Sequence, residues 1–195
     1  MMNGFSSRKV VRLPAQNLGF TLIELLIVMT VVAILSTLSV GDFGALLRTA
    51  SQDSVRDKMQ SALSLSRAES IRRGHRVVLC AAKNSQCMGT SLRGKHRWET
   101  VLVFADVDQD RLYTEGDSLI RQVEFSAGSY VVWNKGHSVI YESDGSLLGG
   151  RNGSFFFFHA SGVDEGVKLV GQLSGRVRRA DFSSSDKSSM AVFLP

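Results

Sequence analysis

Residues 19–40 read GFTLIELLIVMTVVAILSTLSV, and Glu24 is the only charged residue between positions 20 and 40. As a helix rising about 1.5 Å per residue, positions 20–40 would span roughly 31 Å, close to the hydrocarbon thickness of a bilayer. A carboxylate inside such an apolar run is energetically unfavourable, so carboxylates there usually have a function or an ion-pair partner. The stretch therefore predicts a membrane-embedded helix with a functional Glu24. The alternative is that Glu24 sits at the headgroup boundary and has no role.

Residues 19–24 read GFTLIE and follow a basic leader, and this arrangement resembles the cleavage box of type IV prepilins and type II secretion pseudopilins. The resemblance implies that a prepilin peptidase cuts between Gly19 and Phe20, and that Phe20 is then N-methylated. It also implies that the helix packs against other pilins in a filament core. There Glu24 would neutralise the N-terminal amine of a neighbouring subunit, which would answer its desolvation cost.

The charge of the chain is concentrated in the leader. The net charge of the 195 residues is +5, and Arg8, Lys9 and Arg12 supply +3 of it, so the cut protein would carry about +2. Positive residues before an apolar helix hold that end in the cytoplasm. We therefore expect a single-pass inner-membrane protein with a periplasmic domain, which becomes extracellular when it is assembled in a pilus.

The chain divides into a leader (1–19), a transmembrane or filament-core helix (20–40), an amphipathic continuation of that helix (41–74) and a β-rich globular domain (75–195). Apolar residues at helical spacing, among them Val55, Met59 and Leu63, predict a face that packs on a sheet, and Gly74 predicts the helix end. Beyond it the pattern predicts consecutive antiparallel strands, and hence an α+β domain. The expected strands are 76–80, 98–104, 119–125, 130–134, 138–141, 154–159, 166–173 and 176–182. The run Phe155–Phe158 predicts a strand buried on both faces.

Two motifs in the domain bear on chemistry. Cys80 and Cys87 flank a polar stretch of six residues, so in an oxidising compartment we favour a disulfide that pins a hairpin end; free thiols are the alternative. Asp106, Asp108 and Asp110 alternate ahead of Asp117, which loosely resembles a calcium loop. However, Arg111 stands where such a loop needs glycine, and the last position lacks glutamate. An acidic surface loop without metal is therefore favoured, and we expect no cofactor and no enzymatic activity.

Residues 168–182 predict two strands joined by a turn at Ser174-Gly175. Arg176 and Arg178 would then lie on one face about 7 Å apart, a spacing that suits successive phosphates of a nucleic acid. The plain alternative is a solvated strand face. The tail 183–189 is polar, and we expect it to be mobile and able to close over a bound strand.

Several features of the domain are similar to the GspH/FimT group of minor pilins and pseudopilins. They are Cys80, Cys87, Trp98, the segment 104–106 and the Gly-Arg-Val-Arg run 175–178. The resemblance implies a type IV pilin-like fold, with the long helix packed on an antiparallel sheet.

Within the group, a late Gly-Arg-x-Arg marks the FimT-like members, and this implies binding of extracellular DNA for natural transformation. Gly175, Arg176 and Arg178 match the motif; Arg179, Lys168 and Lys187 would assist. The alternative is a GspH-like minor pseudopilin of a type II secretion system, which needs no DNA contact. A further reading keeps the pilus but makes the protein only a primer of assembly.

Overall fold

The computed structural model of the protein describes residues 19–89, 97–149, 152–159, 162–163 and 167–190. Its contacts divide the chain into two units, residues 1–45 and residues 46–195. We call the second unit the head. Helix α1 (Leu22–Arg73) belongs to both units, since it runs without a break through Gly41 and Gly44.

The start of α1 is capped by Thr21, whose Oγ1 accepts a hydrogen bond from the Glu24 backbone N–H at 3.3 Å. Gly19 and Phe20 precede the helix and are exposed, and Glu24 lies in the first turn. Large apolar side chains from Phe20 to Leu35 are 48–85% exposed. Among the described residues, no helix carries an apolar run long enough to cross a membrane. The roles given to Gly19, Phe20 and Glu24 remain predictions.

At its other end, α1 stops where the sequence predicts. Gly74 adopts a φ of +67°, the left-handed conformation that glycine tolerates best. Its N–H donates to the Ser70 carbonyl oxygen at 3.0 Å.

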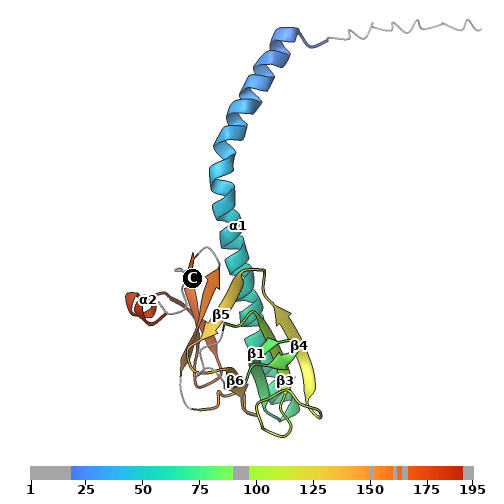
Figure 1. Ribbon diagram of the computed structural model, residues 1–195, viewed down its shortest axis with the longest axis vertical. Coiled ribbons are helices and arrows are strands. Elements are labelled where there is room, and N and C mark those ends of the chain that lie inside the picture. The colour runs from blue at the N-terminus through green and yellow to red at the C-terminus, as the bar shows by residue number, and fades with distance from the viewer. Residues whose placement is uncertain (1–18, 90–96, 150–151, 160–161, 164–166, 191–195) are drawn as a thin grey trace, which may run out of the picture. The chain divides into compact units, whose positions relative to one another are not determined.

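The strands of the head form two antiparallel sheets, which confirms the predicted α+β domain with antiparallel strands. Sheet A has the order β2-β1-β3-β4, and β6 pairs with β1. Its strands are β1 (Val77–Lys83), β2 (Gln86–Cys87), β3 (Thr100–Ala105), β4 (Ser118–Glu124) and β6 (Ser138–Tyr141). Figure 1 shows β1, β3 and β4 beside the C-terminal part of α1.

Sheet B has the order β10-β9-β7-β5, and β8 pairs with β7. Its strands are β5 (Ser129–Trp133), β7 (Gly153–His159), β8 (Gly162–Val163), β9 (Val167–Gly171) and β10 (Val177–Asp181). All eight predicted strands are present with end shifts of a few residues, whereas β2 and β8, of two residues each, were not predicted.

The first hairpin carries the predicted disulfide. Cys80 and Cys87 are bonded across β1 and β2. Asn84 and Ser85 make the turn, with φ of 53° and 59° respectively. Two consecutive positive φ values fit the tight turn that matches strand twist. The bridge therefore fixes the end of sheet A.

The head has three clusters of buried apolar residues. The largest joins the inner faces of both sheets to Val55, Met59, Ala62 and Leu63 of α1. The second covers the outer face of sheet A around Leu102 and Phe104, and the third covers the outer face of sheet B. Phe155 and Phe157 belong to the first cluster, and Phe156 and Phe158 to the third. This confirms that β7 is buried on both faces.

Most of the polar tail forms a short helix, which we did not expect. Helix α2 (Ser184–Met190) begins after Ser183, whose N–H and hydroxyl both donate to the Asp186 carboxylate at 2.9 and 2.6 Å. The Asp186 N–H in turn lies 3.3 Å from Ser183 Oγ, so the two residues cap the helix reciprocally. Met190 packs on the third cluster, so α2 covers sheet B (Figure 1).

Candidate nucleic-acid interface

The predicted basic hairpin is present, formed by β9 and β10 with a three-residue loop at 173–175. The Gln172 N–H donates to the Arg176 carbonyl and the Gly175 N–H donates to the Gln172 carbonyl, both at 2.8 Å. Gly175 has a φ of +75°. A loop of this length with its last residue in the left-handed region is a common hairpin connection, and it favours glycine there.

Gly175 is also required by packing. A Cβ at this position would lie 1.8 Å from the Gly145 carbonyl oxygen and 3.0 Å from Arg67 Nε. Arg67 Nε itself donates to that same carbonyl at 3.1 Å. The first residue of the Gly-Arg-Val-Arg run thus lets the hairpin turn approach the Gly145 turn and α1, and its role here is positional.

Arg176 and Arg178 are exposed cationic side chains of the hairpin. Arg178 lies on β10, which is the edge strand of sheet B, and Arg176 lies just before the strand. Within the described part of the chain, neither guanidinium has an ion-pair or hydrogen-bond partner. Both side chains are therefore available to an anionic ligand.

Arg179 has a different position from the one we expected. It pairs in register with Leu169, which is fully buried in the cluster against α1. Cross-strand partners share a face, so Arg179 lies on the α1 side of the sheet edge. Its NH2 contacts Asp57 at 2.7 Å and its Nε donates to Gln60 at 3.2 Å. Both partners of the ion pair remain more than half exposed, so the pair is solvent-screened.

Lys168 is mostly buried and forms an ion pair within the head. Its side chain is 16% exposed, and its Nζ lies 2.5 Å from the Asp186 carboxylate of α2. Burial alone would raise the pKa of Asp186, but the hydrogen bonds from Lys168 and Ser183 outweigh it and lower that pKa. Lys168 therefore holds α2 on sheet B. The side chain of Lys187 lies outside the described residues.

Arg67 is a residue that the sequence gave no reason to select. It lines a shallow surface hollow together with Ser64, Ala68, Gly175 and Arg176. Its place in α1 is distant in sequence, and only the close approach of the Gly145 and Gly175 turns brings it to the hairpin. Arg67 adds a cationic side chain beside Arg176.

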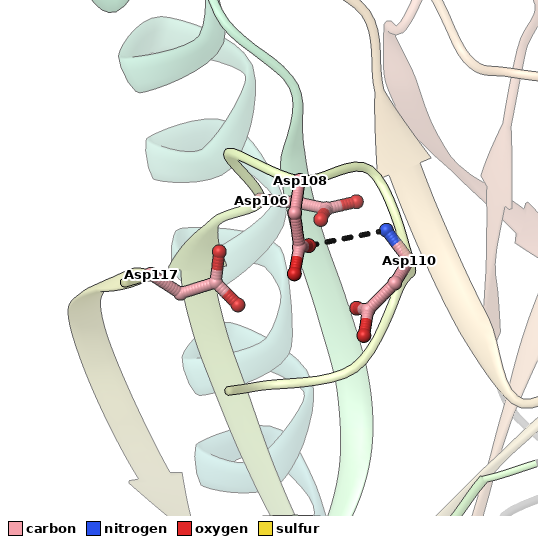
Figure 2. Close-up of side chains that lie close together, drawn as sticks. All are labelled: Asp106, Asp108, Asp110 and Asp117. Atoms are coloured by element: carbon pink, nitrogen blue, oxygen red, sulfur yellow. Dashed lines mark hydrogen bonds between the residues drawn. The ribbon is translucent and has the colours of Figure 1, made fainter. Parts of the chain in front are cut away.

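The head also brings together the four aspartates noted in the sequence. Asp106, Asp108, Asp110 and Asp117 each offer a carboxylate oxygen, and these oxygens lie within 4.8 Å of one another (Figure 2). The group belongs to the β3–β4 loop, in the other sheet from the arginines. In the described part of the chain this is the only set of acidic, histidine or cysteine side chains close enough to share a metal ion.

Comparisons with known proteins agree with this architecture. The family profile described as "Type II transport protein GspH" matches residues 56–175, and a prokaryotic N-terminal methylation motif matches residues 15–40. No curated protein sequence matches significantly.

Similar folds occur among solved structures. Two crystal forms of the type IV minor pilin FimU from Pseudomonas aeruginosa have TM-scores of 0.50 and 0.52 at 13% identity. They cover 68% and 71% of this chain, and 94% and 95% of their own. The minor pseudopilin EpsH from the type II secretion system of Vibrio cholerae has a TM-score of 0.47 at 11% identity, covering 70% of this chain and 99% of its own. The FimU likenesses show a shared fold.

Proposed function

The chain belongs to the GspH family, and from that premise we propose that it is a type IV minor pilin whose head binds extracellular DNA, without sequence preference, for uptake in natural transformation. The family consists of structural pilins and pseudopilins, so the proposed activity is binding and not catalysis. Arg176 and Arg178 are the main contacts in this proposal. Their exposure on an edge strand, without partners among the described residues, is the observation that carries it.

The apolar segment from Phe20 to Leu35, which we call the stem, supports the part of the proposal that concerns filament assembly. The methylation motif covers residues 15–40, and large apolar side chains from Phe20 to Leu35 stand exposed on the isolated chain. Contiguous apolar surface of this kind marks an interaction site. We infer that a prepilin peptidase cuts after Gly19, that Phe20 is methylated, and that the stem resides in the inner membrane until it packs with other pilins through Glu24.

The chemistry of the hairpin supports the binding half. A guanidinium presents a planar fork of donors that matches phosphate oxygens in pairs. Arg67 lines the same hollow as Arg176, and Arg179 remains exposed although it is paired with Asp57. No aromatic residue lies between the arginines of the run, so contact with the backbone is expected rather than base stacking. We assign Lys168 no direct contact with DNA in this proposal, because its ammonium is ion-paired with Asp186.

Few contacts imply weak and salt-sensitive binding. The logarithm of the binding constant falls with the logarithm of salt by roughly 0.9 per phosphate neutralised on duplex DNA. Two arginines therefore account for a slope of about 1.8, and Arg67 would raise it to about 2.7. Several copies on one filament would raise the overall affinity through avidity.

The test is a titration of a fluorescent DNA duplex with the full chain in a non-ionic detergent, at salt concentrations between about 20 and 200 mM. The double variant Arg176→Gln/Arg178→Gln is expected to lose most binding and to lower the salt slope by about 1.8. Its circular dichroism and thermal unfolding should match the wild-type chain.

The matched control is Arg121→Gln combined with Arg72→Gln, which removes the same charge elsewhere. Arg121 is exposed on β4, the edge strand of sheet A, and Arg72 is exposed near the end of α1. The control should keep its affinity. If both double variants lost the same affinity for DNA, the effect would be due to net charge alone, and the hairpin would not be the binding site.

A second candidate, a minor pseudopilin of a type II secretion system, is favoured by the description of the matching family. It requires the same stem, cleavage site and disulfide but no binding of polyanions. The same titration separates the two, because a secretion component should show no saturable DNA binding at about 20 mM salt.

A further inference from the structure

We propose that the β3–β4 loop binds a Ca²⁺ ion through Asp106, Asp108, Asp110 and Asp117. The loop comprises the twelve residues 106–117 that separate the two strands. Calcium loops of twelve residues take ligands from positions 1, 3, 5, 7, 9 and 12. Here positions 1, 3, 5 and 12 are the four aspartates and position 9 is Thr114.

The backbone makes the turn that such a loop requires, although the sequence argued against it. Glycine normally occupies position 6 because the turn there is sharp. Arg111 holds that place with a φ of +68°, in the left-handed region where glycine is favoured. The chain therefore reaches the geometry with a non-glycine residue.

The separation of the carboxylates fits one ion. Their nearest oxygens all lie within 4.8 Å of one another, and Figure 2 shows them gathered inside the loop. Ca²⁺ binds oxygen at 2.3–2.6 Å, so ligands on opposite sides of the ion are roughly 4.6–5.2 Å apart. The group is thus already near the size of a coordination shell.

Asp106 provides an independent indication of a missing partner. Asp106 is 2% exposed, and in the described structure neither carboxylate oxygen accepts a hydrogen bond of ordinary length and angle, although the Arg111 backbone N–H lies near enough to act on its charge. Buried polar groups are almost always bonded, so an orphaned carboxylate facing three others calls for a cation. Burial, together with the charges of Asp117, Asp108 and Asp110, raises the pKa of Asp106, while the Arg111 backbone N–H acts in the opposite direction.

Within the described residues, no ion pair neutralises the charge of the aspartate group. Among the described residues, none of the four aspartates has a basic side chain within ion-pair distance. Arg76 is close enough to interact with the charge of Asp106, but it is bonded to Glu142 at 3.0 Å. Within the described part of the chain, the loop is therefore a dense negative site without an ion-paired cation.

The remaining ligands are held in place by hydrogen bonds that leave oxygen lone pairs free. Asp117 accepts the N–H groups of Val107 and Thr114 at 2.9 and 3.0 Å. Asp108 accepts the Asp110 N–H and the Thr114 hydroxyl, both at 3.3 Å. The set contains no histidine or cysteine, which disfavours zinc. Mg²⁺ usually keeps its waters and takes one or two carboxylates, so four converging carboxylates favour Ca²⁺.

The experiment measures Ca²⁺ binding to the full chain, stripped of metal and kept in a non-ionic detergent at constant ionic strength. Isothermal titration with CaCl₂ is expected to give a saturable site with Kd on the order of 0.1–1 mM, as in extracellular modules. The melting temperature should rise over the same concentration range. MgCl₂ should bind at least about tenfold more weakly, and an equal response to it would overturn the choice of Ca²⁺.

Variants locate the site. Asp108→Asn and Asp110→Asn change exposed residues and should leave the fold intact, while each weakens Ca²⁺ binding about tenfold or more. The matched control Asp144→Asn removes one exposed carboxylate in another turn and should bind as the wild type does. The proposal fails if no saturable binding occurs up to about 10 mM, or if the control loses as much affinity as the loop variants.

Discussion

Replacing Gly175 by alanine is expected to destabilise the head much more than the same change at Gly74. The two glycines have similar backbones, with φ of +75° and +67°. A Cβ at Gly74 meets nothing within 4 Å, whereas a Cβ at Gly175 would lie 1.8 Å from the Gly145 carbonyl oxygen. Gly74→Ala is therefore a matched control that carries only the conformational cost.

The expected loss of unfolding free energy can be estimated from the contacts at each glycine. An alanine held in the left-handed region costs about 1–2 kcal/mol at either position. At Gly175 the Gly145 turn must also move by more than 1 Å to restore a normal contact. Overpacking of this kind costs about 1–3 kcal/mol. Loss of the bond from Arg67 Nε to the Gly145 carbonyl adds about 1 kcal/mol. We expect about 4 kcal/mol for Gly175→Ala and about 1.5 kcal/mol for Gly74→Ala.

Urea unfolding followed by tryptophan fluorescence measures both, because Trp98 and Trp133 are buried in the head. With a slope near 2 kcal/mol per molar, the midpoints of the two variants should differ by roughly 1.2 M. Asparagine tolerates the left-handed region, so Gly74→Asn should recover part of the loss and Gly175→Asn should not. Equal midpoints for the two alanine variants would refute the close approach of the two turns.

Two further predictions concern the ion pairs of the head. Asp57→Asn releases Arg179 from a solvent-screened ion pair, so the free energy of unfolding should change by less than about 1 kcal/mol. DNA binding should become stronger, and the salt slope should rise by up to about 0.9. Weaker binding in the titration would contradict this prediction. The pKa of Asp186 is lowered from its usual value of 3.8, so its ionised carboxylate stabilises the folded head at pH values above 3.8. This stabilisation is lost as the pH falls below 3.8 and the carboxylate becomes protonated. Asp186→Asn should therefore flatten the acid limb of the melting temperature against pH, and an unchanged limb would show that the bond to Lys168 contributes nothing.

The secondary structure of the head could be read from the sequence because its signals are local. Helical spacing of apolar residues and Gly74 located the end of α1, and the Phe155–Phe158 run identified a strand covered on both sides. The division into two sheets was not predicted, since strand pairing depends on contacts between distant residues. Helix α2 was missed because Ser183 and Asp186 form its cap in a stretch with only Met190 as an apolar anchor.

The candidate site was predictable only in part, for the same reason. The alternation of side chains along a strand correctly placed Arg178 on an exposed face. The face of β10 that points toward α1 depends on its register with β9. In that register Arg179 pairs with Leu169, and its side chain therefore contacts Asp57 of α1. The burial of Lys168 followed from the docking of a helix that was not expected. In the aspartate loop the spacing was visible, whereas the left-handed backbone of Arg111 could not be inferred from an arginine.

The docking of α2 has a practical consequence for anyone who shortens this protein. A deletion that begins at Ser184 would remove Met190, which packs against Tyr130, Phe156 and Phe158, and would expose an apolar aromatic surface to solvent. Such a truncated chain would be prone to aggregate, and a loss of DNA binding in the titration would reflect poor solubility as much as the removal of a basic residue. Point changes, rather than C-terminal trimming, are the sound way to probe this end of the molecule.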